Sequence, residues 1–327
     1  MIGTYLVRIG DYGIPSMGAC VLVGAILAVY FSWLLRKKSA LDWNNEVVDA
    51  IILAVLLGFV GMKLLYWIVT PEVFKTAFTD GVFKGLLSLL MEGMVFYGGL
   101  IGGIVGIILV AHKKKKNFFE FADLMAPCFC VAHAFGRIGC LLVGCCYGVA
   151  EGEPMLFGAA TYHGALAIYY PALPNNEGAG PAWRLPVPLM EAVFLILLAV
   201  VLMLIYRRTK RLGLVTGLYL TLYALWRFAI EGFRGDAVRK IYWIFSTSQW
   251  ISFGILIAGI VILILSRKWK RGEPFKVFRE EELVVPEPEE PADEPDEADE
   301  AVEEKAAEAV AEEIADAVEE AGGPDGE

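Results

Sequence analysis

Arginine and glutamate side chains interrupt two otherwise apolar stretches of the sequence. Arg137 lies in one stretch, Arg227 and Glu231 lie in another, and Arg234 follows directly. Ionised groups inside a membrane are costly and usually functional, and a guanidinium fork binds two oxygens of a phosphate or carboxylate at once. These residues predict a buried site for an anionic group, in which Glu231 pairs with Arg227 or Arg234. Alternatively, the arginines pair with Glu191 and Glu231 only to hold the helices together.

Thiols are concentrated around Arg137. At about 100° per helical residue, Cys130, His133, Arg137, Cys140 and Gly144 share a face about 80° wide. The spacing matches no tetrahedral metal motif, so we expect no metal. A membrane thiol–disulfide relay, or buried thiols acting as small apolar side chains, are the other interpretations. The six cysteines are Cys20, Cys128, Cys130, Cys140, Cys145 and Cys146.

The elements that carry these side chains are predicted to be transmembrane helices. The chain of 327 residues is 57% hydrophobic, with a mean hydropathy of +0.57, whereas a soluble domain is about 45–50% apolar. This composition excludes a single soluble domain, a disulfide-stapled secreted module and a wholly disordered chain. Because about 20 apolar residues span a bilayer, we predict an all-α membrane protein of seven helices. The predicted spans are Met17–Leu35, Val47–Val69, Met94–Ala111, Phe121–Val143, Pro188–Tyr206, Leu214–Phe233 and Trp250–Ser266.

Basic residues predict the orientation of these helices. Clusters holding 15 Lys and Arg follow the odd-numbered spans, and the opposite connections hold seven. The positive-inside rule therefore predicts an N-terminus outside and a C-terminus in the cytoplasm.

The C-terminal segment differs sharply from the rest of the chain. From Arg279 to Glu327 there are 22 acidic and two basic residues, which explains the net charge of −10. We predict a transmembrane domain over residues 1–272 and an acidic, mostly disordered cytoplasmic tail over residues 273–327. The tail is expected to have no catalytic role, or to dock a basic partner.

The segment Gly136–Gly148 resembles the signature of the prolipoprotein diacylglyceryl transferase family, which opens with Gly-Arg-x-Gly and closes on a glycine. Further resemblances follow in family order. They are Tyr12-Gly13, Phe96–Gly102, Pro186–Glu191, Arg227–Asp236 and Ser246–Ser252.

The resemblance implies an enzyme of the bacterial cytoplasmic (inner) membrane whose active site faces the outer leaflet. Such enzymes transfer the diacylglyceryl group of phosphatidylglycerol, a membrane lipid, to the lipobox cysteine thiol of a preprolipoprotein and release glycerol 1-phosphate. No cofactor and no nucleic acid are expected. The resemblance implies four catalytic residues, which are Arg137, Arg227, Tyr97 and Glu231. It implies eight substrate-binding residues, which are Arg137, Gly98, Gly99, Gly139, Cys140, Gly148, Arg234 and Tyr12.

The sequence also departs from the family pattern. Tyr97 stands where the family usually has a histidine that is a candidate base, and Cys140 stands at a usual asparagine. An acidic residue is common at Cys145, and Pro188 and Met190 replace a glutamine and a tyrosine. These changes leave open a diverged member with another lipid donor or acceptor. From a different class, a thiol-redox membrane protein or a transporter is also open.

Overall fold

A computed structural model describes residues 5–9, 12–39, 41–73, 85, 89, 93, 95–155, 161–171, 180–235, 241–242 and 245–270. Contacts within the chain divide it into two units, Met1–Phe275 and Lys276–Glu327. The predicted acidic tail, residues 273–327, lies outside the described residues.

Long helices dominate the described part of the first unit. They are α1 (Ser16–Leu35), α2 (Val48–Val69), α5 (Phe96–Lys113), α6 (Phe118–Val143), α7 (Val187–Arg208), α8 (Leu214–Ile230) and α9 (Thr247–Leu265). Short 3₁₀ or π turns extend three of them and are η1 (Arg36–Lys38), η2 (Trp43–Val47) and η3 (Glu231–Phe233). The mostly helical character predicted from the sequence is confirmed.

Six of these helices are long and apolar enough to cross a membrane. Their outward side chains are apolar as well, as Leu22 and Ile26 on α1 and Val55 on α2 illustrate, each more than half exposed. A helix that is apolar on all faces suits a membrane span rather than a water-facing surface. The predicted sixth span corresponds to α8, whose 17 residues are at the short end of what crosses a bilayer, so a seventh crossing stays a prediction.

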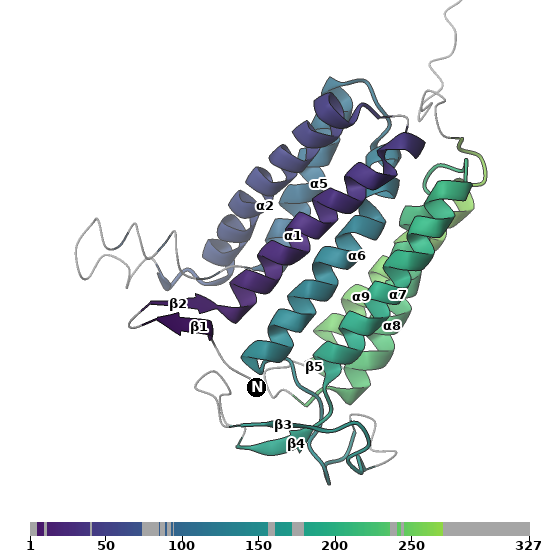
Figure 1. Ribbon diagram of the computed structural model, residues 1–327. Helices are drawn as coiled ribbons and strands as arrows, with labels where there is room; N and C mark the ends of the chain where they lie inside the picture. Colours follow the sequence, from purple (N-terminus) through teal and green to yellow (C-terminus); the bar gives the residue numbers. More distant parts are fainter. Residues whose placement is uncertain are drawn as a thin grey trace, which may run out of the picture. The chain divides into compact units, whose positions relative to one another are not determined.

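The helices pack as neighbouring pairs, α2 with α5, α1 with α6, α6 with α7, and α8 with α9 (Figure 1). Glycines let α2 and α5 approach closely, because a β-carbon at Gly98 would lie 2.8 Å from the carbonyl carbon of Gly61. Asp123 links α6 to the start of α8. Its buried carboxylate accepts hydrogen bonds from the Gly213 N–H (2.8 Å) and from the Thr216 N–H and hydroxyl (2.8 and 2.7 Å). This contact sets the register between the two helices that carry Arg137 and Arg227.

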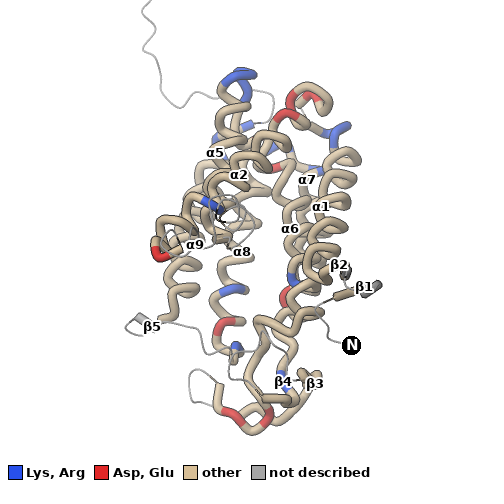
Figure 2. Tube along the Cα trace, turned by 90° about the vertical axis from the view of Figure 1, so that its left-hand side faces the viewer, with Lys and Arg blue, Asp and Glu red and all other residues tan. Residues whose placement is uncertain are grey.

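In the described part of the chain, three antiparallel hairpins lie at one end of the helices (Figure 1). Their strands are β1 (Tyr5–Ile9) with β2 (Tyr12–Pro15), β3 (Ile168–Tyr170) with β4 (Ala182–Arg184), and β5 (Ile241–Tyr242) with β6 (Phe245–Ser246). Lysine and arginine residues gather at the opposite end, where α1, α5 and α7 finish (Figure 2). The two ends of the helices therefore differ in both charge and backbone structure.

Candidate active site where four helices meet

The polar side chains of the apolar helices converge near the end that carries the hairpins. Arg137 lies near the C-terminus of α6, Glu191 near the N-terminus of α7, and Arg227 in the last turn of α8. Because these helices alternate in direction, the three positions come to the same level. The sequence pattern located each residue, and the alternation of the helices brings them together.

Arg137 forms an ion pair with Glu191 across the α6–α7 contact. Its Nη2 lies 3.1 Å from Oε1 of Glu191, whose side chain is fully buried, and its Nε donates to Nε2 of His133 at 3.4 Å. The hydroxyl of Tyr223 on α8 also donates to Oε1 of Glu191, at 3.3 Å. One carboxylate therefore orients groups from two neighbouring helices.

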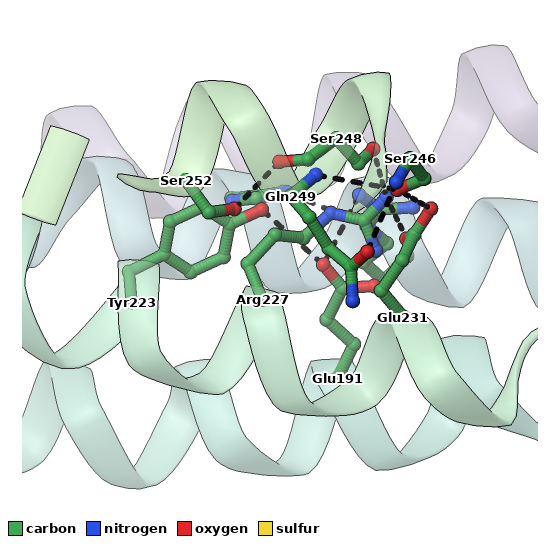
Figure 3. Close-up of polar contacts among 10 residues, drawn as sticks. Glu191, Tyr223, Arg227, Glu231, Ser246, Ser248, Gln249 and Ser252 are labelled. Atoms are coloured by element: carbon green, nitrogen blue, oxygen red, sulfur yellow. Dashed lines mark hydrogen bonds and ion pairs between the residues drawn. The ribbon is translucent and has the colours of Figure 1, made fainter. Parts of the chain in front are cut away.

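Arg227 is held by groups on its own helix and on α9 (Figure 3). Its Nη2 lies 3.0 Å from Oε2 of Glu231 and donates to the Ser248 hydroxyl at 2.9 Å. The Ser246 hydroxyl donates to Oε1 of Glu231 at 2.9 Å and also caps α9 through the backbone N–H of Gln249. Of the two partners predicted for Glu231, which were Arg227 and Arg234, the pair with Arg227 is confirmed.

Several polar atoms of this cluster remain without a hydrogen-bond partner among the described residues. They are Oε2 of Glu191, Nη1 of Arg227 and Nε2 of Gln249, and all three atoms are buried. Buried polar atoms are normally satisfied, so unsatisfied ones at a charged cluster point to a ligand or water that completes them. In Arg227, Nη2 contacts Glu231 and Ser248, whereas Nη1 has no hydrogen-bond partner among the described residues.

The segment that follows α6 forms the wall beside this cluster. Its residue Gly148 pairs with Arg234 in an isolated β-bridge and donates its N–H to the Leu185 carbonyl at 2.8 Å. A β-carbon at Gly148 would lie 2.7 Å from that carbonyl oxygen and 2.8 Å from the Phe233 carbonyl oxygen. Only glycine fits between these two neighbouring segments, and the bridge places Arg234 beside Gly148 in the segment that follows α6.

Three thiols meet at the same place. The sulfur atoms of Cys140, Cys145 and Cys146 lie within 4.8 Å of one another, and all three residues are partly exposed. Hydrogen bonds from Cys140 and Cys145 hold the pKa of the Cys146 thiol well below its usual range, and the charge of Arg234 acts in the same direction. The hydrogen bonds to Cys140 and Cys146 raise the pKa of Cys145. The sequence spacing did not predict this convergence.

The other predicted site residues lie apart from these contacts. Tyr97 is 41% exposed at the start of α5 and contacts Phe96 edge to face. Gly98 and Gly99 pack against α2, and a β-carbon at Gly139 would lie 2.8 Å from the Met17 sulfur of α1. Tyr12 lies in β2, and its side chain is outside the described part of the chain. Among the described residues, no hydrogen bond or ion pair joins Tyr97 to Arg137 or Arg227.

Sequence reasoning missed the contribution of the start of α9. Ser246, Ser248 and Gln249 were noted only as part of a resemblance, and Tyr223 was not noted. A Ser followed three residues later by Gln before an apolar run is a recognisable capping box, and the structure contains it. The capping box locates the start of α9. No local signal predicts that Ser248 contacts Arg227, because the two residues are 21 positions apart in the sequence.

Comparisons with known proteins show the family of this chain. The family model described as prolipoprotein diacylglyceryl transferase matches residues 4–265. The chain is 33% identical over 263 residues to phosphatidylglycerol–prolipoprotein diacylglyceryl transferase 2 of Clostridium perfringens, covering 80% of this chain and 94% of that protein. It is 32% identical to the Clostridium tetani enzyme of the corresponding name (78% and 94% covered) and 31% identical to that of Streptococcus uberis (84% and 99% covered). A family match over most of the chain, together with these relatives, shows that the chain belongs to the prolipoprotein diacylglyceryl transferase family.

Proposed function

We propose that this protein transfers the diacylglyceryl group of phosphatidylglycerol to the lipobox cysteine thiol of preprolipoproteins and releases glycerol 1-phosphate. The observation that carries the proposal is the buried arginine cluster. Arg137 and Arg227 lie in apolar helices of a chain whose relatives are named for this reaction.

The charge of the cluster suits a phosphodiester. Arg137, Arg227 and Arg234 carry three positive charges, and Glu191 and Glu231 carry two negative ones. The guanidinium groups of the cluster complement the negative charge of a phosphatidylglycerol head group. When the carbon–oxygen bond breaks, the leaving phosphate gains charge, and guanidinium groups placed there stabilise it.

The residues then take distinct roles. The open Nη1 of Arg227 donates to a phosphate oxygen, while Glu231 and Ser248 hold the rest of its fork. Arg137 contributes charge from the opposite helix, oriented by Glu191. The remaining predicted substrate-binding residues line the donor or acceptor path, with the Tyr97 hydroxyl facing the lipid head group. These residues are Tyr12, Gly98, Gly99, Gly139, Cys140 and Gly148.

The same proposal includes an orientation in the membrane. With seven crossings, the basic end of the helices faces the cytoplasm and the hairpin end faces outward, as the positive-inside rule requires. Arg137 and Arg227 lie near the C-terminal ends of α6 and α8, and the hairpins lie at this end of the helices (Figure 1). The reaction then takes place at the outer leaflet, where the lipobox segment of an exported preprolipoprotein emerges.

A transfer assay tests the proposal. Purified full-length protein in mixed micelles with phosphatidylglycerol and a lipobox peptide is expected to release glycerol phosphate and to add a diacylglyceryl group to the peptide cysteine. Arg137→Ala is expected to abolish transfer, whereas Arg207→Ala, an exposed arginine at the basic end, is expected to preserve it. Absence of lipidated peptide with the unmodified protein would refute the proposal. Full activity of Arg137→Ala would remove the phosphate role of that residue.

A further inference from the structure

The three thiols beside the arginine cluster are held together by the way α6 ends. Gly144 is left-handed (φ 77°) and reverses the chain, and the Cys145 N–H bonds back to the Cys140 carbonyl at 3.0 Å. Cys146 is also left-handed (φ 60°), a conformation that costs free energy for a residue with a side chain. The left-handed residues in this turn accompany a chain reversal that places Cys145 and Cys146 close to Cys140.

The spacing of the sulfur atoms suits a soft metal ion. Zinc–thiolate bonds of about 2.3 Å in a tetrahedral site place the sulfurs about 3.8 Å apart. Sulfurs within 4.8 Å of one another surround a point at most about 2.8 Å from each, so shifts of about 0.5 Å bring all three to bonding distance. Three sulfur ligands favour zinc over magnesium or calcium, which require oxygen.

The set of ligands is incomplete in a way that suits a bound substrate. Within the part of the chain that the structure describes, no fourth Cys, His, Asp or Glu joins the three thiols. Structural zinc sites have four protein ligands, whereas zinc sites that act on substrates have three and leave one position open. The partial exposure of all three residues keeps that position accessible.

Positive charges lie beside the three thiols. Arg137 interacts electrostatically with Cys140 and Cys146, and Arg234 interacts with Cys146. Nearby guanidinium groups lower the electrostatic cost of the thiolates that a zinc ion binds.

We propose that Cys140, Cys145 and Cys146 bind one zinc ion, and that its open position takes the thiol of the acceptor cysteine. This inference rests on the proposed function. On binding zinc, the acceptor thiol loses its proton to solvent. The bound thiolate attacks the glyceryl carbon that carries the phosphate, so a carbon–sulfur bond forms and the carbon–oxygen bond breaks. The electron pair leaves with the phosphate as glycerol phosphate, and zinc is unchanged.

Metal analysis and cobalt substitution test the binding. Purified full-length protein is expected to retain one zinc per chain after desalting, and Co²⁺ exchanged into it is expected to show thiolate-to-cobalt charge transfer with tetrahedral visible bands. Cys140→Ser, Cys145→Ser and Cys146→Ser are each expected to lower Co²⁺ affinity at least tenfold. The matched control is Cys128→Ser on the same helix, whose buried thiol donates to the Leu124 carbonyl. Sub-stoichiometric metal, unchanged binding in the three variants, or a disulfide within the trio by mass spectrometry would overturn the proposal.

The acceptor role has its own readout. A lipobox peptide is expected to intensify the charge-transfer band of the Co²⁺ protein, and the same peptide with serine in place of cysteine is expected to leave it unchanged. An unchanged spectrum with the cysteine peptide would refute thiol activation while leaving the transferase proposal intact. Conversely, a spectral change without any diacylglyceryl transfer would refute the proposed function and not the metal site. Removing zinc with a chelator is expected to lower transfer at least tenfold, with recovery on adding Zn²⁺. Full transfer by the metal-free protein would overturn the catalytic part.

Discussion

Replacing Arg227 with lysine keeps a positive charge and removes the fork. In the native protein, Nη2 of Arg227 pairs with Glu231 and Ser248, while Nη1 makes no hydrogen bond within the described residues. The single nitrogen of lysine can replace Nη2 in the pair with Glu231. It then has no second nitrogen to offer the phosphate.

Arg227→Lys is expected to lose mainly activity, whereas Arg227→Ala is expected to lose both activity and stability. A hydrogen bond to a charged group contributes about 1.5–3 kcal/mol, so Arg227→Lys is expected to lower kcat/KM roughly 10- to 150-fold. Its stability changes little, because Glu231 keeps a cationic partner. Arg227→Ala leaves the Glu231 side chain, which is only 1% exposed, without its cation, and breaking such a pair costs about 3–5 kcal/mol.

The assay combines activity with unfolding. Transfer from phosphatidylglycerol to a lipobox peptide is measured for both variants in one detergent, together with thermal unfolding of each. Arg227→Lys is expected to unfold close to the native temperature with strongly reduced transfer, and Arg227→Ala to be impaired in both. Transfer by Arg227→Lys within threefold of native would show that the open nitrogen does not serve the reaction. Equal destabilisation of both variants would show that the fork is structural.

Three further predictions concern the surroundings of the site. Gly148→Ala forces a β-carbon against two carbonyl oxygens and is expected to cost about 1–3 kcal/mol of stability. Thermal unfolding should show this loss of stability. The control Gly136→Ala is expected to keep the native unfolding temperature, because a β-carbon there meets nothing within 4 Å. Glu191→Gln removes the charge that compensates Arg137 and is expected to lower thermal stability. Anionic phosphatidylglycerol should restore part of it and zwitterionic phosphatidylcholine none, and equal rescue by both lipids would contradict the charge argument. Gly98→Ala is expected to weaken the α2–α5 contact and to lower the unfolding temperature. An unchanged unfolding temperature would contradict this packing role and favour a role of Gly98 in binding the lipid head group.

Local sequence was a good guide to the helices because hydropathy is a local property. The apolar stretches located six helices that are long and apolar enough to cross a membrane, as well as the position of α8, and helix boundaries shifted by only a few residues. The hairpins were not predicted, because their strands are short and their partners are set by the loops. The tail remains a prediction from composition.

The charges of the site were predicted, and so were two of its ion pairs, because the sequence offered Glu191 and Glu231 as partners of the arginines. Arg137, Arg227 and Glu231 stood out because charges are rare in apolar sequence. Helical spacing offered Arg227 and Arg234 as partners of Glu231, and the structure contains the pair with Arg227. The contact of Arg227 with Ser248 depends on the packing of α8 against α9, which no local pattern encodes.

By itself, the sequence determined that the chain is a membrane protein and which charges lie within it, since hydropathy and ionisation belong to individual residues. Tertiary structure decided what those charges contact. Helix alternation brought Glu191 to Arg137, and the capping of α9 brought Ser248 to Arg227. It also decided that Cys140, Cys145 and Cys146 converge. The reason is that two left-handed residues reverse the chain after α6, and backbone reversal, unlike helical spacing, cannot be read from a ligand motif.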